Sequence, residues 1–599
     1  MDKVNELAWG ASLLSMLAQP LWGRPVADLV ADDFGPDERR AAFVHYAVPA
    51  MSAVQRLPDA YPADGTAGGP VRIVMAKEEY EPGSFVIWAN RELKDVQLSL
   101  SAFKSEKGDV FPAEALDLKV VKVWYQNRNA WFSYFGDTGF KLCPELLLND
   151  EDLIRVDTAK EANYARIREK DGRIREQWLN PPREIARVHW DCHRGGDAFA
   201  CMRPGFEDAD TLRPVRLEKG AFKQFFLTAH ATKGTPAGVY RGTVCVGRLG
   251  KVPVEIRVLD FELPRPMCYF DDTRPFHVNF YNYECFGMMM ELNGGDLELT
   301  KRQAAAVLKN HAAHGQDINW IRWSILEAEG VDYQKMTDEA GYDTRVMCGA
   351  VPLATGGGTS VEREQAIRRA AEAVRARYGD REVYVPYGDE PPAWWLQKTR
   401  KDLELVQRYG FRLILAGSDS VYRKAGYQYD WHNIAKTPED DSSTRLWNQF
   451  GSSARVAWYA QMHVGVENPD FNRRQNGMAA YLSNYSCLCN YAHHFGSYND
   501  DSEGYKPMVF TYGQAKGVLD TLQWEGFREG LDDIRYATVL VKLARRASAQ
   551  RADMRLRFEG NKALQFLAEF RKDADDLNAC RLEMIRLILR LQGLLKRKI

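Results

Sequence analysis

The period of the apolar residues changes near residue 266, from a strand pattern to alternating strand and helix patterns, and no other feature of this chain constrains the fold as much. From Val71 to Phe261, short runs such as VRIVMA, SFVIWAN and VPVEIRVLDF are rich in β-branched and aromatic residues and are separated by turn signals. These runs predict an antiparallel β-sandwich of about seven or more strands. Two prolines, Pro264 and Pro266, then form a natural linker.

After Cys268, strand-like and helix-like segments alternate. Helices are predicted at 299–311, 361–378 and 393–409, and the strand-like runs INWIRW, RVMCGA, EVYVPYG and FRLILAG lie between or after them. Because eight βα units need about 250 residues, the rest of the chain up to about residue 545 fits a (β/α)₈ barrel. The final stretch has a helical pattern with many Arg and Lys, which predicts a helical tail with a solvated, charged face.

The predicted fold class is therefore a multidomain β and α/β chain. An N-terminal antiparallel β-sandwich precedes a (β/α)₈ TIM-like barrel and a C-terminal helical tail. The expected domains are an N-terminal extension at 1–67, the sandwich at 68–266, the barrel at 267–545 and the tail at 546–599. A charged, partly helical insertion is expected inside the sandwich at 144–185.

Composition and targeting signals exclude some classes and leave others open. The net charge is −2, so no basic field attracts nucleic acid, and the absence of a run of about 18 apolar residues argues against a membrane span. The segment at 7–18 (LAWGASLLSMLA) resembles a signal-peptide core, but Asp2 and Glu6 precede it where a leader carries net positive charge. Secreted, periplasmic and cytoplasmic locations all stay open, as do disulfides and the oligomeric state.

The sharpest local signal is a pair of adjacent acids, Asp389 and Glu390, between a β-rich run and two prolines (VYVPYGDEPP). Residues at the C-terminal ends of barrel strands line the active site. Glycoside cleavage commonly needs two carboxyl groups, and mutual repulsion helps to keep one of them protonated. The competing interpretation is an exposed helix start, where acids favour the helix dipole.

Architecture and motifs together resemble glycoside hydrolase family 123. Its members are β-N-acetylgalactosaminidases with a β-sandwich followed by a (β/α)₈ barrel. Four passages carry the resemblance, in order along the chain: the segment at 71–89, which is similar to the family's opening strands with their pattern of an acid and then F-x-V, the last sandwich strands at 235–264, the Asp-Glu pair in YGDEP, and the R-E-G-x-x-D segment at 528–533. Family members often carry a Trp-rich stretch before the final helix, where this chain has YLSNYSCLCN, so its sugar contacts are expected to differ.

The resemblance implies hydrolysis of terminal β-linked N-acetylhexosamine, preferably N-acetylgalactosamine, by a retaining, substrate-assisted mechanism. Asp389 would orient and stabilise the substrate's 2-acetamido group as it forms an oxazolinium ion. Glu390 would act as general acid and then as general base. No metal or organic cofactor is implied, and the partner would be a glycan or glycoconjugate.

Aromatic residues make up 12% of the chain, and their rings suit sugar faces as well as cores. The candidate substrate-binding residues, each with core or loop packing as the alternative role, are Trp323, Tyr387, Trp394, Trp431, Tyr459, Asn484 and Tyr485. Arg528 and Glu529 are expected instead to hold the last barrel helix by ion pairs. His311 and His314, three residues apart, are expected at a surface or a helix end.

Two other functions stay open at this stage. The first is a retaining glycosidase for a sugar without an acetamido group, with Glu390 as acid/base and a distant carboxylate such as Glu525 as nucleophile. The second is a non-catalytic glycan-binding protein. The adjacent acids argue against the second, since a binder does not need a repelling pair.

Overall fold

The computed structural model describes residues 33–596 apart from a set of internal segments. These segments are 59–61, 128–138, 181–204, 283–285, 287–288, 291–292, 353–358, 418–428, 437–443, 445–454, 461–465, 496–507 and 573. The leader-like stretch at 7–18 lies outside the described residues. No described helix has the length and hydropathy needed to cross a membrane. The seven cysteines of the described part are all free thiols.

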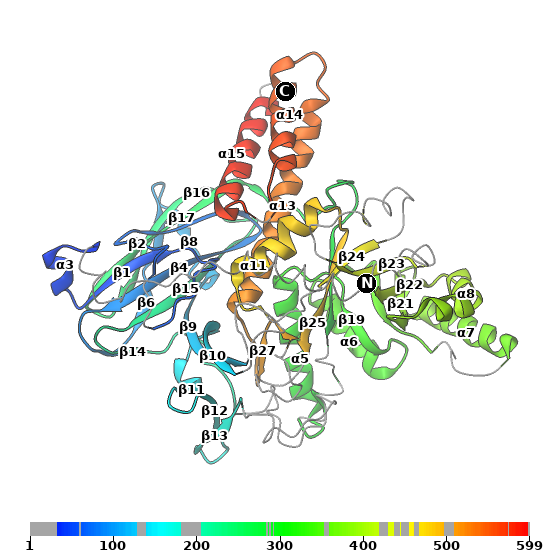
Figure 1. Ribbon diagram of the computed structural model, residues 1–599, viewed down its shortest axis with the longest axis horizontal. Coiled ribbons are helices and arrows are strands. Elements are labelled where there is room, and N and C mark those ends of the chain that lie inside the picture. The colour runs from blue at the N-terminus through cyan, green and yellow to red at the C-terminus, as the bar shows by residue number, and fades with distance from the viewer. Residues whose placement is uncertain are drawn as a thin grey trace, which may run out of the picture.

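Two packed sheets form the predicted sandwich (Figure 1). The first has the order β10 (Phe140–Leu148), β9 (Leu116–Asn127), β15 (Phe222–Ala231), β4 (Glu79–Ala89), β1 (Phe43–Val48) and β2 (Thr66–Ala67). The second has the order β3 (Val71–Lys77), β17 (Gly250–Glu262), β16 (Gly238–Val246), β7 (Phe103–Ser105) and β8 (Val110–Phe111), with β6 (Leu98–Leu100) also on β16. A pair made of β5 (Leu93–Val96) and β14 (Val215–Leu217) completes the domain. Pairing is antiparallel throughout, except that β3 and β17 run parallel.

Two features of this domain differ from the expectation. β1 belongs to the stretch assigned to an N-terminal extension, yet it pairs with β4 along its whole length. The part of the insertion that is described, up to residue 180, is mainly a sheet, and its helical part is one short 3₁₀ helix (Glu151–Leu153). After the end of β10 it forms an antiparallel sheet of β11 (Ile154–Asp157), β12 (Ala162–Arg168) and β13 (Ile174–Trp178). Arg155 and Asp157 alternate with apolar residues in β11, as Arg166 and Arg168 do in β12, so this charge-rich segment is an antiparallel sheet.

The second domain is the predicted barrel. Among the described residues, eight parallel strands follow one another in the order β18 (His277–Asn282), β25 (Cys487–Phe495), β24 (Arg455–Ala460), β23 (Trp431–Lys436), β22 (Arg412–Gly417), β21 (Glu382–Asp389), β20 (Val346–Ala350) and β19 (Trp320–Ser324). The ring closes near the start of β18, where the Asp317 and Ile318 amides donate to the Val278 carbonyl at 3.2 and 3.1 Å. The (β/α)₈ fold class is therefore confirmed.

Helices cover the outside of the barrel. They are α5 (Leu297–Ala313), α6 (Ala328–Glu339), α7 (Ser360–Tyr378), α8 (Ala393–Arg408), α11 (Pro469–Arg474) and α12 (Ala480–Leu482). The alternation of β21 explains how both faces of the barrel wall are filled. Val383, Val385 and Tyr387 pack in one cluster with the helices, whereas Tyr384 belongs to the cluster inside the barrel.

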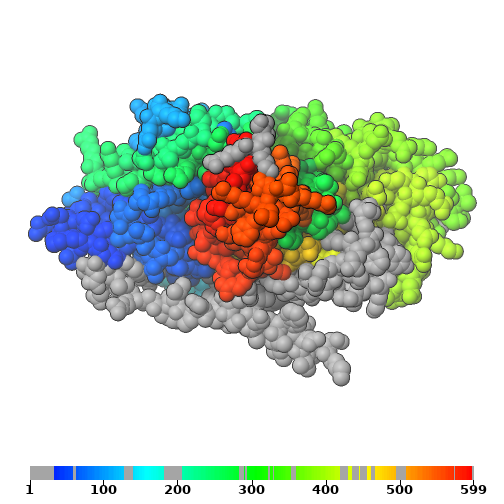
Figure 2. All heavy atoms as spheres, turned by 90° about the horizontal axis from the view of Figure 1, so that it is seen from above, coloured from blue at the N-terminus to red at the C-terminus, as the bar shows by residue number. Residues whose placement is uncertain are grey.

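The C-terminal helices form an arm rather than a tail on the barrel surface. α13 (Leu522–Ser548) begins as the last barrel helix and continues outward, where α14 (Met554–Ala568) and α15 (Leu577–Lys596) pack against it (Figure 1). Seen from above, this arm stands between the sandwich and the barrel (Figure 2). It is therefore in position to join the two domains.

Arg581 of α15 makes this joint with a buried set of carboxylates. Its guanidinium lies 2.6 Å from Glu81 of β4 and 2.6 Å from both Glu529 and Asp533 of α13. Arg473 of α11 binds the same Asp533 at 2.7 and 3.0 Å. The predicted role of Glu529 in holding the last barrel helix by ion pairs is thus confirmed, and its partner comes from the arm.

We expect Arg581→Ala to destabilise the protein by about 3–5 kcal/mol, because it leaves buried carboxylates without their cation. Arg586→Ala on the same helix is the matched control, since the Arg586–Glu583 pair is partly exposed to solvent, and it should cost less than about 1 kcal/mol. Urea unfolding of both variants measures the difference. Equal losses would show that the cluster does not hold the domains together.

The His311 and His314 side chains are both buried, contrary to a surface position, although His314 is the C-cap residue of α5. The His311 ring lies 3.9 Å from that of His493 and 6.0 Å from that of Trp524. Neither of its ring nitrogens has a hydrogen-bond partner in the described part of the chain. Burial, reinforced by the neighbouring His314, lowers the pKa of His311 to about 3.

A pH dependence follows from this burial. Between pH 6.5 and about 3, the unfolded chain binds a proton at His311 that the folded chain does not, so stability falls as the pH falls through this window. One such group contributes a slope of about 1.4 kcal/mol per pH unit. His311→Phe should remove that slope and leave stability near pH 7 almost unchanged. Urea unfolding between pH 7 and 4 tests it, and an unchanged slope would contradict it.

Candidate active site

The end of β21 carries the predicted carboxylate pair. β21 pairs with β22 in regular register up to Pro386, and the register then shifts before Asp389. A bulge of this kind re-aims the side chains that follow it. Glu390 has a φ of 41°, and its amide donates to the Ala416 carbonyl at 3.1 Å. Both carboxylates are exposed at the C-terminal end of a barrel strand, where a ligand can reach them.

Gly388 makes this turn of the chain possible. Its φ of 91° lies in the left-handed region, and a Cβ there would come within 3.0 Å of two ring atoms of Trp395. Trp395 in turn packs against Tyr387, with ring centroids 5.7 Å apart. The run GDEPPAWW therefore acts as one local unit. Glycine allows the turn, the prolines end the strand, and a tryptophan of α8 covers the turn from outside.

A group of four aromatic rings lies on neighbouring strands inside the barrel. The Tyr281 ring of β18 is its centre, 4.7 Å from Trp320, 5.7 Å from Tyr459 and 5.7 Å from Tyr491. Tyr281 and Tyr491 also face each other in the register of β18 and β25. These rings come from four different elements, and only barrel closure brings them together. We call this set the aromatic group.

Asn433 contacts the aromatic group and lies in register with the carboxylate pair, one strand away. Ala416 of β22 pairs with Asp389 on one side and with Asn433 on the other, so these two residues stand at the same level of the barrel. The Asn433 amide donates to the Tyr281 hydroxyl at 3.1 Å, and its oxygen accepts from the Trp431 indole at 2.7 Å. Burial, with a smaller contribution from the Asp389 charge, raises the pKa of Tyr281 well above its usual value.

The predicted residues near the carboxylate pair occupy different surroundings. The Tyr387 ring packs on Trp395 of α8 and so faces the helical shell, away from the barrel interior. Trp394, at the start of α8, is 63% exposed and is free to meet a ligand. Trp323 lies near the C-terminal end of β19, and its side chain is outside the described residues.

The remaining predicted residues are divided between the two ends of the barrel. Tyr459 belongs to the aromatic group. Trp431 opens β23 and is fully buried, so it reaches the site only through its bond to Asn433. Asn484 and Tyr485 precede β25, because α12 occupies the stretch expected to begin the strand. They therefore lie at the opposite end of the barrel from Asp389 and Glu390.

Tyr281, Trp320, Asn433 and Tyr491 are site residues that sequence reasoning missed. Each lies in a strand-like run, and the sequence around it does not distinguish a site residue from a core residue. A partial signal exists, since Asn279 and Tyr281 alternate in FHVNFYNY, as Trp431 and Asn433 do in WHNIAK. Polar and aromatic residues at every second position are typical of a barrel interior that opens to a ligand.

Glu525, the distant nucleophile considered above, is already engaged in the described structure. One carboxylate oxygen lies 3.2 Å from His314 Nε2, and the other pairs with Arg528. The residue is buried between the sandwich and α5. The expected ion-pair role of Arg528 is thus confirmed, and Glu525 belongs to the domain junction.

Among the described residues, one group of three side chains could hold a metal: His277, Asp317 and Asp343. It does not lie with the carboxylate pair, because His277 opens β18 and Asp317 precedes β19. Arg265 already binds both aspartates, at 2.9 and 3.2 Å. A guanidinium in this position takes the place that a metal ion would need.

The comparisons with known proteins agree with this architecture. No family model and no curated protein matches the sequence. Among solved structures, a family 123 glycoside hydrolase from Clostridium perfringens, described for glycolipid glycan hydrolysis, aligns with a TM-score of 0.58 and 11% identity over 88% of this chain and 94% of that chain. A family GH5 xyloglucanase from Bacteroides ovatus gives 0.21, with 9% identity over 77% of this chain and 98% of that chain. A Streptomyces mannanase catalytic domain gives 0.24, with 13% identity over 40% and 86%. The last two TM-scores are too low to indicate a shared fold.

The fold is that of a sandwich-plus-barrel protein with an acidic pair at the end of the fourth barrel strand. More specifically, it is the fold of a family 123 glycoside hydrolase, as the sequence resemblance suggested.

Gly388→Ala tests how the site is built. We expect a loss of about 2–4 kcal/mol in unfolding free energy, from the left-handed φ and from contact with Trp395. Gly341→Ala is the matched control, because its φ of 97° is similar and nothing lies within 4 Å of its Cβ position. It should cost about 1–2 kcal/mol. Urea unfolding measures both, and equal losses would remove the role of Trp395.

Proposed function

We propose that this chain is a glycoside hydrolase that removes terminal β-linked N-acetylhexosamine, with N-acetylgalactosamine preferred, from a glycan or glycoconjugate. The observation that carries the proposal is the exposed Asp389–Glu390 pair beside the aromatic group, in a fold shared with a family 123 glycoside hydrolase. Neither carboxylate makes an ion pair or a side-chain hydrogen bond with another of the described residues, so no structural role explains this exposed pair. Rings beside it suit the apolar face of a sugar.

In the proposed reaction, the substrate supplies its own nucleophile. The carbonyl oxygen of its 2-acetamido group attacks the anomeric carbon, the bond to the leaving oxygen breaks, and an oxazolinium ion forms. Glu390 donates its proton to the leaving oxygen during this step. Asp389 accepts the amide N–H and stabilises the positive charge that develops on the acetamido group. Substrate assistance is a known exception to the two-carboxylate scheme.

In the second half of the reaction, Glu390 acts as a base. It takes a proton from a water molecule, whose oxygen attacks the anomeric carbon and opens the oxazolinium ion. The product keeps the β configuration because both steps invert it. The two acids act on different groups of one substrate. In a regular strand, consecutive side chains point to opposite faces. The bulge before Asp389 interrupts that pattern, which supports the proposal that both acids face the same substrate.

The aromatic group supports the acetamido requirement. Tyr281, Tyr459 and Tyr491 offer ring surface for the sugar and the acetamido methyl, and Asn433 holds the Tyr281 hydroxyl in place. A sugar without the acetamido group would leave Asp389 without its partner and the reaction without its nucleophile. We therefore expect a strict preference for 2-acetamido sugars.

Hydrolysis of 4-nitrophenyl β-glycosides of N-acetylgalactosamine, N-acetylglucosamine, galactose and glucose tests the proposal. Turnover is expected for the two acetamido sugars only. Asp389→Asn should lower kcat/KM by about 10²–10³-fold. Glu390→Ala should lower it by about 10²–10⁴-fold on a natural glycan, and less on nitrophenyl substrates, whose leaving group needs little protonation.

Asp380→Asn, at the exposed residue just before β21, is the matched control and should keep full activity. Melting temperatures of all variants exclude unfolding as the cause of any loss. Turnover of the non-acetamido sugars alone would overturn substrate assistance. Binding of glycans without any turnover would favour a glycan-binding protein.

A further inference from the structure

The contact between the sandwich, the barrel and the arm holds more buried carboxyl groups than cations. Its two cations are Arg473 and Arg581, and its four carboxyl groups are Glu79 and Glu81 of β4 and Glu529 and Asp533 of α13. The side chains are 5% exposed or less, except that of Glu81, at 15%. Solvent therefore screens little of the repulsion among the four carboxyl groups. We call this set of six residues the acidic joint.

The distances in the acidic joint bring like charges close together. Arg581 Nη1 lies 2.6 Å from Glu81 Oε2 and 2.6 Å from Glu529 Oε2, so these two oxygens lie within about 5 Å of each other. Two carboxyl groups at this separation do not both ionise at their usual pKa. Burial, followed by the charge of Glu529, raises the pKa of Glu81 well above its usual value. The geometry thus favours a joint that keeps a proton.

Glu79 is the carboxyl group best placed to hold this proton. Its Oε1 has no hydrogen-bond partner among the described residues and lies 3.8 Å from Arg581, whereas the other three carboxyl groups each lie 2.6 Å from that side chain. Its Oε2 accepts from the Ala76 amide at 2.6 Å and from the Tyr536 hydroxyl at 2.7 Å. A proton on Oε1 keeps both of these bonds and needs no cavity.

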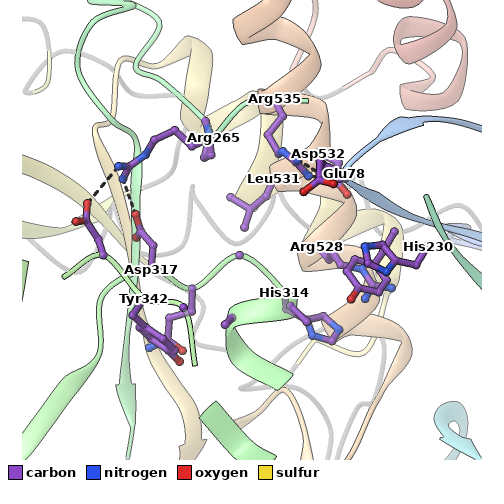
Figure 3. A pocket seen from close by; sticks show the side chains of 18 of the residues that line it. Glu78, His230, Arg265, His314, Asp317, Tyr342, Arg528, Leu531, Asp532 and Arg535 are labelled. Carbon is purple, nitrogen blue, oxygen red and sulfur yellow. Dashed lines mark hydrogen bonds and ion pairs between the residues drawn. The ribbon is translucent and has the colours of Figure 1, made fainter. Parts of the chain in front are cut away.

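The groups on the surrounding elements set the charge of Glu79. Burial is the largest cause and, with the charge of Asp532, raises the pKa of Glu79 to about 8, although Arg581 lowers it. Asp532 and its partner Arg535, 2.6 Å apart, lie at the edge of the pocket between the sandwich and the barrel (Figure 3). The other titratable groups on the elements packed around Glu79 are Glu81 of β4, Lys77 of β3, His230 of β15, Arg473 of α11, and Arg528, Glu529, Asp533 and Tyr536 of α13.

We propose that the acidic joint is a pH-sensitive contact, which holds the sandwich against α13 and the arm while Glu79 is protonated and opens more readily as the pH rises. In an open joint, Glu79 meets water and returns to its usual pKa of 4.5, whereas in the closed joint it keeps its proton up to about pH 8. Between these values the closed joint binds one proton more than the open joint, so its stability falls as the pH rises. The proposal does not depend on the reaction at the carboxylate pair.

Urea unfolding between pH 5 and 9 tests this proposal with Glu79→Gln. Glutamine is neutral, and its amide oxygen can accept the two bonds that Glu79 Oε2 accepts, so it stands in for the protonated group. The variant should nearly match the wild type at pH 5 and be more stable at pH 9. The ratio of the two unfolding constants should change by up to about tenfold per pH unit between pH 5 and 8.

Asp533→Asn is the matched control, because it makes the same chemical change within the acidic joint. The Asp533 carboxylate accepts bonds from both Arg473 and Arg581, at 2.7 and 2.6 Å. Its neutralisation should therefore lower stability at every pH in this range. A Glu79→Gln protein that is less stable than the wild type at pH 9, or that keeps the wild-type pH dependence, would overturn the proposal.

Hydrogen exchange separates opening of the acidic joint from unfolding of the whole chain. After correction for intrinsic rates, the Ala76 amide and the amides of α15 should exchange faster at pH 9 than at pH 6 in the wild type. In Glu79→Gln they should exchange equally at the two pH values. The amides of β16, in the second sheet of the sandwich, should not change in either protein. Equal exchange of Ala76 and α15 at both pH values in the wild type, or an equal acceleration of β16, would also overturn the proposal.

Discussion

One guanidinium, that of Arg581, joins the three parts of this molecule, and the rest of the architecture depends on it. It binds carboxylates from the sandwich strand β4 and from the barrel helix α13, while it belongs to the arm helix α15. The carboxylates nearby outnumber the arginines, and burial raises the pKa of Glu79 to about 8. A carboxyl that keeps its proton near neutral pH lowers the repulsion within the cluster. A buried cluster of this kind is sensitive to the loss of a single partner, and it therefore fixes how the domains sit against one another.

The same cluster gives a physical meaning to two of the motifs that carry the family resemblance. The acids before Phe85-Val86-Ile87 include Glu81, and the R-E-G-x-x-D segment includes Glu529 and Asp533. All three meet at Arg581, so these motifs describe a domain joint. Gly526 and Gly530 of α13 fit the same view, because an added Cβ would come within 2.6 Å of backbone atoms of α11. Since the joint lies beside the N-terminal ends of the barrel strands, it leaves their C-terminal ends free for a substrate.

Periodicity was enough to predict the sandwich, the barrel and the helical end, because each depends on patterns within short segments. The carboxylate pair was predictable for the same reason, since strand, glycine, acids and prolines are consecutive. The rest of the site was not. The direction of Tyr387 depends on its packing with α8, and Trp431 comes at the beginning of its strand. Asn484 and Tyr485 were placed at a strand end because α12 was not foreseen. The aromatic group needs residues more than 200 positions apart, such as Tyr281 and Tyr491, and only closure of the barrel shows that they meet.

The backbone at the strand end that carries the acids explains how two adjacent carboxylates can both be accessible to one substrate. In a regular strand, neighbours point to opposite faces, and one of two consecutive acids would be lost to the helical shell. Here Tyr387 still points to that shell, and the bulge at Gly388 then breaks the alternation before Asp389. Glu390 takes a left-handed φ, a conformation that costs a non-glycine residue about 1–2 kcal/mol. Its hydrogen bond to Ala416 and the cover of Trp395 over Gly388 offset that cost. The local strain is thus maintained by contacts outside the pair, and it leaves both carboxylates in solvent at the level of Asn433 and the aromatic group.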